Sequence, residues 1–577
     1  MTAVASSPLA SLLAYLVLFA ALSLRWLASA AEGIPINTVY ARGDTRLLTW
    51  ILWWVSRSIT GDAGSVLDAP INYPATGQLT GSEHFAALQL LFFPAFAATG
   101  NAVLAVNLVL FLAYPLAAWL MSRLLVGLRF DPLVACVVGL AFALGAHQVP
   151  THVHQMHVLP LYLPAVALAL HRLREAQDAR ALLPLVAVFG LACLTAYYTV
   201  AVLVQVVVLW TGTELLRRRP GRLRFALQVG IVVTGCLGLL WLASRPYLMR
   251  ARLVGSLADV EATVRLMAAM SSVHLRLGAV EIFGAVSLVL AVAGCAGLLA
   301  RRRRPIALLG IALVAAGAFL VCGGGLTVVS ALPPSPLTDL LRLSVTFIRA
   351  LSRYAVIVGF GVALLGAVGL HLATRALPRA GAAILLAFVA LAVVGERGRR
   401  LWTQDIEHIR AVTSDAPVYA RVAAITAQAG RGPLLELPLS SFGYSLQPEA
   451  MMGSMQHELP LVSGHTGYLP PHRPVVDATI ERLPAEGALQ DLVDMTRVGW
   501  ILLRPARYWA DVETRASFAR ELTSLSGVGP AWEIDGWTLL AVRREPRHAD
   551  WFDAIARGDL PREVLATRPA PSVDRQL

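Results

Sequence analysis

The sequence predicts an α-helical polytopic membrane protein of about eleven transmembrane helices, followed by a soluble C-terminal α/β or α+β domain. Its 577 residues are 57% hydrophobic and only 15% charged, with a mean hydropathy of +0.64. Apolar runs long enough to span a bilayer recur from Leu9 to about Gly395. From residue 397 onward the composition becomes that of an ordinary soluble protein. These observations exclude a wholly soluble multidomain chain.

The basic residues and their distribution exclude several classes of site and partner. The chain has a formal net charge of +12 and contains no lysine, so all 48 basic residues are arginine. That absence excludes a Walker P-loop, a Schiff-base lysine and a Ser–Lys dyad. Residues 1–396 carry 28 basic and 14 acidic side chains, whereas residues 397–577 carry 20 and 22. Because the positive excess lies among the apolar segments, it indicates membrane orientation, and no nucleic-acid partner is expected.

The apolar runs set the transmembrane segments. The first run, 9–28, has no positive charge before it and is long for a signal peptide, so an uncleaved helix is expected. The run 86–98 is too short to cross and contains Pro94, which favours an interfacial or re-entrant helix. The remaining predicted spans are 101–123, 131–149, 157–172, 181–196, 198–216, 223–244, 281–300, 306–325, 350–372 and 380–396.

Arginines in the short loops predict the orientation. With the N-terminus in the cytoplasm, all of the arginine-rich loops fall on the cytoplasmic side, the 217–224 loop and the run Arg301 to Arg304 among them. The C-terminal domain then lies outside the cytoplasm. The resulting localisation is the inner (plasma) membrane, with several passes.

The domain boundaries follow from loop lengths and composition. Residues 1–396 form the predicted membrane domain, with long outer loops at 30–100, 245–280 and 326–349, and long loops often carry function. Residues 397–555 form the extracytoplasmic domain, and 556–577 are expected to be a disordered tail. Within the domain we expect strands at Pro433–Leu437, Trp500–Leu503 and Trp537–Val542, and helices at Asp415–Ala429 and Asp511–Ser524.

The first outer loop holds the main catalytic candidate. Asp44 precedes an amphipathic run, 47–59, whose tryptophans suit a helix at the membrane surface. A carboxylate at the boundary between membrane and water is costly unless it is functional or paired. The alternative for Asp44 is pairing with Arg42, Arg46 or Arg57. Further polar candidates in this loop are Asp68, Asn72, Tyr73, Glu83 and His84.

Histidines gather near the outer end of the third span. They are His147, His152, His154 and His157, with Gln155 among them. With Glu83 and His84 they offer ligands for a divalent metal. Their spacing matches no established metal motif, so hydrogen bonding to a polar substrate is favoured and no tightly held metal or other cofactor is expected.

Arginines at the outer membrane edge suit a phosphate. Arg245, Arg349 and Arg353 lie there, and the planar guanidinium binds phosphate oxygens in pairs. Snorkelling toward lipid headgroups is the alternative for each. The five cysteines lie in apolar runs and are expected to be small core residues.

Taken together, these features resemble the GT-C superfamily of polytopic glycosyltransferases. The resemblance covers about residues 1–396 and centres on Gly43-Asp44, about fifteen residues after the first span. A bacterial branch with GT-C-like architecture also resembles the chain in 68–74, 82–84, 154–155, 349–354, 434–438 and 461–468. The outer loop lacks the Asp-x-Asp motif that some GT-C families carry, so Asp44 corresponds by position alone.

The resemblance implies a membrane glycosyltransferase that uses a polyprenyl-phosphate-linked sugar and an acceptor glycan, lipid or protein outside the cytoplasm. In that interpretation Asp44 is the general base, and Arg349 or Arg353 neutralises the departing phosphate. Glu83, His84, His154 and Gln155 then bind sugar or acceptor hydroxyls, with Asp68, Tyr73 and Arg245 as further binding candidates. Two alternatives stay open: a flippase or transporter of lipid-linked glycans, and a non-catalytic assembly protein of the cell envelope.

Overall fold

The computed structural model divides the chain into two compact units. It describes residues 7–557 except 37–40, 146–155, 157–158, 177, 179, 218, 248–264, 273–274, 276–278, 281, 332, 334–349 and 442–443, and gives only the backbone at 41, 42, 326, 329 and 400. We call residues 1–41, 85–244 and 255–407 the helical unit, and residues 42–84, 245–254 and 408–577 the α/β unit. The predicted fold class, a polytopic helical membrane protein with a small C-terminal sheet, is confirmed.

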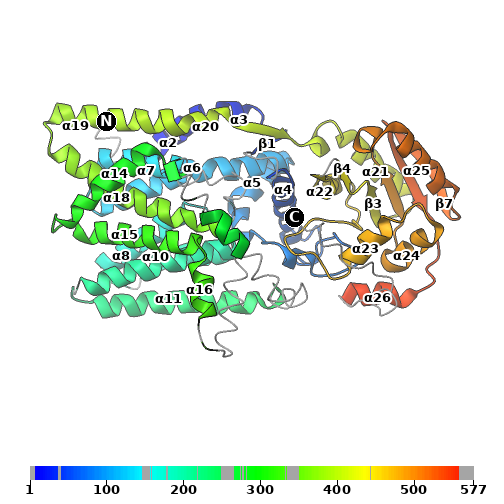
Figure 1. Ribbon diagram of the computed structural model, residues 1–577, viewed down its shortest axis with the longest axis horizontal. Coiled ribbons are helices and arrows are strands. Elements are labelled where there is room, and N and C mark those ends of the chain that lie inside the picture. Colours follow the sequence, from blue (N-terminus) through cyan, green and yellow to red (C-terminus); the bar gives the residue numbers. More distant parts are fainter. Residues whose placement is uncertain are drawn as a thin grey trace. The chain divides into compact units, whose positions relative to one another are not determined.

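The helical unit is a bundle of apolar helices (Figure 1). Six described helices are long and apolar enough to cross a membrane: α6 (Ala102–Gly127), α10 (Tyr197–Leu216), α11 (Arg222–Ala243), α15 (Arg304–Val321), α18 (Ala355–Arg375), and α19 (Arg379–Val393) with its continuation to Thr403. Shorter helices complete the bundle: α2 (Pro8–Leu22), α3 (Leu24–Ala28), α5 (Gln89–Thr99), α7 (Pro132–Gly145), α8 (Tyr162–Ala176), α9 (Leu182–Cys193), α14 (Ala285–Gly294), α16 (Gly324–Ser330) and α20 (Arg399–Thr403).

Helix α18 lies in the core of the bundle. Of its most apolar stretch, 94% is buried, and α14, α15 and α7 pack around it. Glycines permit the close approach of its neighbours: a Cβ at Gly361 would lie 2.7 Å from the carbonyl oxygen of Gly310, and one at Gly317 would lie 2.8 Å from Val358. Small residues at helix contacts are typical of membrane bundles, because backbones can then pack directly together.

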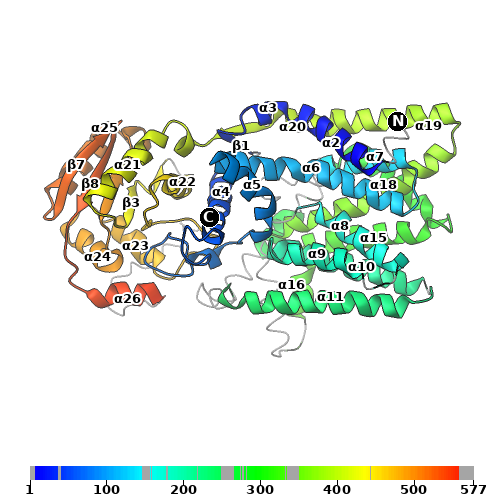
Figure 2. The same ribbon diagram turned by 180° about the vertical axis from the view of Figure 1, so that it is seen from behind.

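Helices α11 and α19, in contrast to α18, are mostly exposed. They run along two edges of the bundle in both views (Figures 1 and 2), and only 22% and 17% of their apolar stretches are buried. Leu223, Leu227, Ile231 and Leu239 of α11 are more than half exposed. Exposed leucine and isoleucine along a whole helix face would be unfavourable in water, so these faces fit contact with lipid.

The first predicted span departs from a single helix. It divides at Ser23 into α2 and α3, and the chain then forms β1 (Gly33–Ile36), which pairs with β2 (Asp405–His408). The buried Asn107 of α6 fixes this turn of the chain: its amide donates to the carbonyl oxygens of Ala30 and Gly33 and accepts from the indole of Trp26. Hydrophobicity alone could not reveal this turn, because the polar residue that holds it lies 77 and 74 positions from Ala30 and Gly33.

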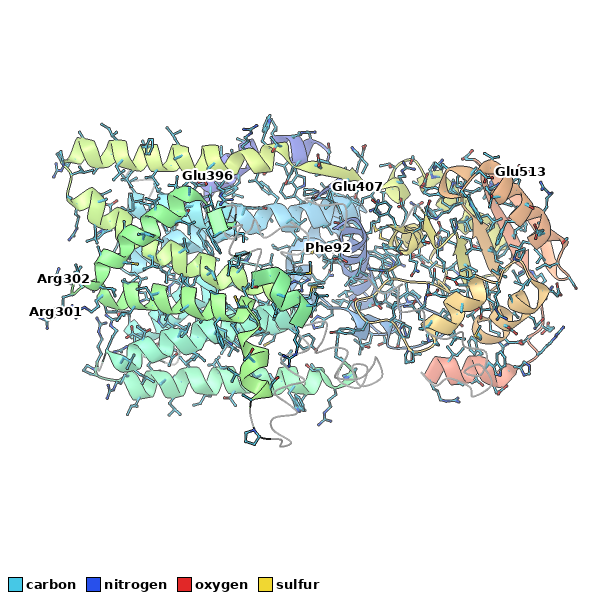
Figure 3. All side chains as sticks on the ribbon, viewed as in Figure 1. Phe92, Arg301, Arg302, Glu396, Glu407 and Glu513 are labelled. Carbon is cyan, nitrogen blue, oxygen red and sulfur yellow. The ribbon has the colours of Figure 1, made fainter. Side chains whose placement is uncertain are left out.

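Glu396 ties α19 to α14. Its carboxylate accepts the backbone N–H of Ala285 in the first turn of α14, at 2.7 Å, and Figure 3 labels it beside these helices. A carboxylate is favourable at a helix N-terminus because it pairs with unsatisfied N–H groups there. The run predicted as interfacial, 86–98, forms α5, and its position relative to the membrane stays a prediction.

The α/β unit is built on a four-stranded sheet in the order β3-β6-β8-β7. The strands are β3 (Leu434–Leu437), β6 (Trp500–Leu503), β7 (Val528–Ile534) and β8 (Trp537–Val542); β3 pairs with β6 in parallel, and the other pairs are antiparallel. A two-stranded hairpin, β4 (Ser440–Ser441) and β5 (Tyr444–Ser445), follows β3. The three predicted strands are confirmed, whereas β7, whose residues are mostly half-exposed, was not predicted.

Helices cover both faces of this sheet. The helices of the unit are α4 (Ala41–Ile59), α21 (Ala416–Ala429), α22 (Gln447–His457), α23 (Arg473–Ile480), α24 (Glu486–Thr496), α25 (Val512–Ser524) and α26 (Ala549–Arg557), and of these α4 packs against α22. Leu435, Ile501 and Leu540 point to the core shared with α23, α24 and α26. On the other face, Tyr419 of α21 packs against Trp537, with ring centroids 5.6 Å apart. The predicted helices 415–429 and 511–524 are confirmed as α21 and α25.

Two boundaries differ from those expected. The segment 42–84, predicted as part of a membrane-domain loop, belongs to the α/β unit. Its helix α4 was expected at the membrane surface, but Trp50, Trp53 and Trp54 are 0%, 6% and 6% exposed, and the Trp50 indole donates to Ser454 of α22 at 2.9 Å. The tryptophans therefore serve a protein core, which amphipathicity alone does not distinguish from a membrane interface. At the C-terminus, α26 continues to Arg557, and residues 558–577 lie outside the described part.

Candidate functional site

Asp44 lies in the first turn of α4 and faces a histidine of the same unit. Its carboxylate is 4.0 Å from Nε2 of His465, and the two side chains are 40% and 35% exposed. Acidic residues are favourable in the first turn of a helix, because the helix dipole is positive there. A separation of 4.0 Å exceeds a direct hydrogen bond but allows charges to interact. The pair is therefore accessible to a polar ligand from solvent.

Two of the three arginines considered as partners for Asp44 pair elsewhere. Arg46 is 3.6 Å from Glu449 of α22, and Arg57 is 3.1 Å from Glu458. The third, Arg42, has a side chain outside the described atoms. These ion pairs hold α4 against α22 at both ends of the helix.

The segment carrying His465 is fastened to the first outer loop by backbone hydrogen bonds. Leu461 donates to the carbonyl of Pro70 at 2.9 Å, and Tyr73 donates to the carbonyl of Leu461 at 3.0 Å. Further along, Tyr468 donates to the carbonyl of Gly81 at 3.0 Å. Residues 70–81 and 461–468, far apart in sequence, thus form one surface of the α/β unit.

A buried polar cluster fixes this surface. Asn72 is fully buried and accepts from the guanidinium of Arg473 at 3.2 Å, while its backbone carbonyl lies 3.2 Å from Nε2 of His472. Gly464 allows the closest approach: a Cβ there would lie 2.7 Å from Cβ of Ile71. Buried polar groups of this kind are costly when unsatisfied, so they favour one arrangement of the two segments.

Asp68 and Tyr73 have structural contacts in this surface. Asp68 accepts the backbone N–H of Gly77 at 2.8 Å and closes the turn between them. The ring of Tyr73 packs against Phe552 of α26 at 5.8 Å, and partial burial raises the pKa of its phenol. Asp68 and Tyr73 thus help to shape the surface formed by residues 70–81 and 461–468.

Glu83 and His84 lie at the end of the same loop. Glu83 is 8% exposed, and the ring of His84 contacts Tyr247 edge to face at 6.3 Å. Burial lowers the pKa of His84 to about 4, so its imidazole is neutral at physiological pH. A neutral imidazole is a hydrogen-bonding group and not a counter-ion for phosphate. Arg245, two residues before Tyr247, is exposed.

Arg353 lies in the helical unit. Its guanidinium stacks on the ring of Tyr198, 4.0 Å from the centroid, and within the described residues its N–H groups make no hydrogen bond or ion pair. Stacking holds the plane of a guanidinium while leaving its edge available for an anion.

Three predicted site residues, His154, Gln155 and Arg349, lie outside the described residues, as do the other histidines of that cluster, His147, His152 and His157. Among the residues that are described, no three His, Cys, Asp or Glu side chains are grouped so as to hold a metal.

One functional candidate, His465, was missed from the sequence, where it was noted only within the run 461–468. The sole signal for His465 was its position between Gly464 and Gly467, because its partner lies 421 residues earlier in the chain. Such a pairing becomes visible only when α4 is placed against the segment after α22.

The helices and the sheet define a multi-pass helical membrane protein that carries an α/β unit. No protein-family model matches the chain, and no curated protein matches it either. Among solved structures, it is similar to a mutant of the arabinofuranosyltransferase AftD from mycobacteria. The TM-score is 0.48 at 14% sequence identity. The match covers 89% of this chain and 42% of that one, so the chain spans less than half the length of this neighbour.

Proposed function

We propose that the chain is a membrane glycosyltransferase that transfers a sugar from a polyprenyl-phosphate-linked donor to an acceptor outside the cytoplasm. The observation that carries the proposal is the Asp44–His465 pair, half-exposed on a surface that Asn72 and Arg473 fix. A carboxylate with an imidazole beside it is a suitable arrangement for taking a proton from a hydroxyl group.

In the proposed reaction, Asp44 accepts the proton of the acceptor hydroxyl as that oxygen bonds to the anomeric carbon. The bond from the anomeric carbon to the donor phosphate breaks, and its electron pair leaves with the polyprenyl phosphate. His465 orients the carboxylate and shares the proton. In the helical unit, the N–H edge of Arg353 is available for an anion.

The transporter alternative receives less support from the spans. Transport of a charged glycan would call for charged or polar groups near the middle of the membrane. On α18, the central helix, the buried residues are apolar apart from His371 near its end. Glu214 of α10 is buried, but it lies two residues before the end of the helix and pairs with Arg174 at 3.3 Å.

The decisive variant is Asp44→Asn, which keeps the size of the side chain but removes the proton acceptor. We expect turnover to fall by about 10²- to 10⁴-fold, measured as radiolabel transfer from polyprenyl-phosphate sugars in proteoliposomes. Asp62→Asn is the matched control, because Asp62 is an exposed aspartate of the same unit that bonds only locally, to Thr60. Unchanged transfer by Asp44→Asn would contradict the proposal.

A further inference from the structure

A large cavity opens at the arginine-rich end of the helical unit. Its volume is about 880 Å³, and its wall comes from the C-terminal ends of α6, α8, α10 and α18 and from the beginning of α15. Drug-sized ligands occupy cavities of roughly 300–1,000 Å³, so the space is sufficient for a ligand. All of its lining residues belong to the helical unit, whereas Asp44 belongs to the α/β unit.

The charge in this cavity is strongly unbalanced. Eight arginines and two glutamates line it. One of the two, Glu214, is already matched by Arg174 and Arg217, which both contact its carboxylate. Burial lowers the pKa of Arg303, and the neighbouring charge of Arg375 acts in the same direction.

The position of the arginines relative to α15 adds to this imbalance. Arg301, Arg302 and Arg303 precede the helix, and Arg304 is its first residue. A helix N-terminus has a partial positive charge and favours anions, so four cations there repel the dipole as well as one another. An anion bound among them would relieve both repulsions.

The arginines divide into anchored and available groups. Arg303 is anchored: it donates to the carbonyls of Leu128 and Arg129 at 3.1 and 2.9 Å and stacks on Phe130. Within the described residues, the guanidinium groups of five others make no hydrogen bond or ion pair: Arg129, Arg219, Arg301, Arg302 and Arg375. Figure 3 shows Arg301 and Arg302 extending from the end of the bundle.

The rest of the wall is apolar. Trp210, Ile306, Leu309, Leu364 and Leu372 contribute side chains from α10, α15 and α18. An arginine cluster beside an apolar wall is suited to a ligand with a charged head and an apolar or aromatic remainder.

We infer that this cavity binds a phosphate-bearing anion, whose oxygens are held by the available arginines around the start of α15. The anion is either the headgroup of an anionic phospholipid or a soluble organic phosphate, since both present the same oxygens. Arginine forks bind phosphate through two parallel N–H bonds, which makes them selective for this shape of anion.

The test uses the purified full chain in detergent and two probes, inorganic pyrophosphate and phosphatidylglycerol, with phosphatidylcholine as the neutral lipid. Binding is measured by native mass spectrometry and by the shift of the melting temperature. The variant Arg301→Gln/Arg302→Gln removes two available arginines that make no contact holding the fold together. Its control, Arg224→Gln/Arg379→Gln, removes two exposed arginines that do not line the cavity.

We expect at least one anionic probe to bind wild type and the control alike, and the cavity variant at least about tenfold more weakly. Preference for phosphatidylglycerol over phosphatidylcholine identifies a lipid headgroup, and preference for pyrophosphate identifies a soluble phosphate. Equal binding of both probes by cavity variant and control would overturn the inference, as would no binding to wild type. If the double variant fails to elute as a single species, the single variants Arg301→Gln and Arg302→Gln decide by the same criterion.

Discussion

Two charge pairs in the α/β unit differ in almost every physical respect. Glu436 of β3 and Arg504 after β6 are 2.6 Å apart, with side chains 1% and 0% exposed. Asp44 and His465 are 4.0 Å apart and more than a third exposed. The first pair is closed to solvent and belongs to the core, whereas the second is longer and is reached by solvent. Distance and exposure therefore distinguish a buried charge pair of the core from ionisable side chains at the surface.

The buried pair also belongs to a network. The hydroxyl of Tyr419 donates to Glu436 at 3.0 Å, and Arg504 donates to the backbone carbonyl of Leu446 at 3.3 Å. Burial raises the pKa of Glu436, while Arg504 and the tyrosine act in the opposite direction. Removing one member would leave a charge without its partner in the interior, which is strongly unfavourable.

The largest effect on stability is therefore expected from Arg504→Met. We expect the free energy of unfolding to fall by about 3–5 kcal/mol, because Glu436 is left buried and unpaired. Urea unfolding of the full chain in detergent, followed by tryptophan fluorescence, measures this loss. Arg482→Met is the control, since its pair with Asp491 at 3.0 Å has side chains that are 52% and 35% exposed, and such pairs contribute less than about 1 kcal/mol. An equal loss of unfolding free energy in the two variants would contradict the prediction that the buried pair contributes more than the exposed one.

A second variant tests the surface that carries His465. Gly464→Ala places a Cβ against Ile71, which we expect to cost about 1–3 kcal/mol and to loosen the segment 461–468. Gly64→Ala is the control, because no atom lies within 4 Å of a Cβ there. Limited proteolysis and thermal unfolding report the two consequences. A neutral Gly464→Ala substitution would mean that the segment is not fixed against the first outer loop.

Acid should weaken the α/β unit through buried histidines. Burial lowers the pKa of His457 to about 3, and its Nδ1 accepts the backbone N–H of Leu459 at 3.0 Å. In the unfolded chain the imidazole of His457 has an ordinary pKa near 6.5, so it binds a proton there before it does in the folded state as the pH falls. Stability is therefore complete above about pH 6.5 and declines toward pH 3, by at most about 1.4 kcal/mol per pH unit for this residue. The pH dependence of the melting temperature should be shallower in His457→Gln, and an unchanged slope would contradict this origin.

The sequence was sufficient for the elements whose signal is local. Three strands of the α/β unit are short, mostly apolar runs, and α21 and α25 are helical stretches that the sequence predicts; Asp511 caps α25 by accepting the N–H of Thr514. The apolar runs likewise located the membrane helices. Within the site, Asp44 was chosen from its loop and from the family resemblance; the structure places it in the first turn of α4, and its role stays a prediction.

The remaining features depend on contacts between distant segments. The tryptophans of α4 have the same spacing whether they face lipid or α22, so the sequence could not separate the two. The turn of the chain from Trp26 to Gly33 is held by Asn107, and the partner of Asp44 depends on how 461–468 is fastened to 70–81. The arginine-lined cavity is formed by the ends of five helices. In the sequence, the arginines at each of these ends indicate only how the helix is oriented in the membrane.

The central claim is that Asp44 and His465 act together on one substrate proton, and a double-mutant cycle on turnover tests it most directly. Transfer from polyprenyl-phosphate sugars is measured for wild type, Asp44→Asn, His465→Gln and the double variant, with folded protein quantified in each preparation. We expect both single variants to be impaired and the double variant to be about as slow as Asp44→Asn, because residues that act as a unit are not additive. Losses that multiply, or retained turnover per folded molecule in Asp44→Asn, would contradict the account.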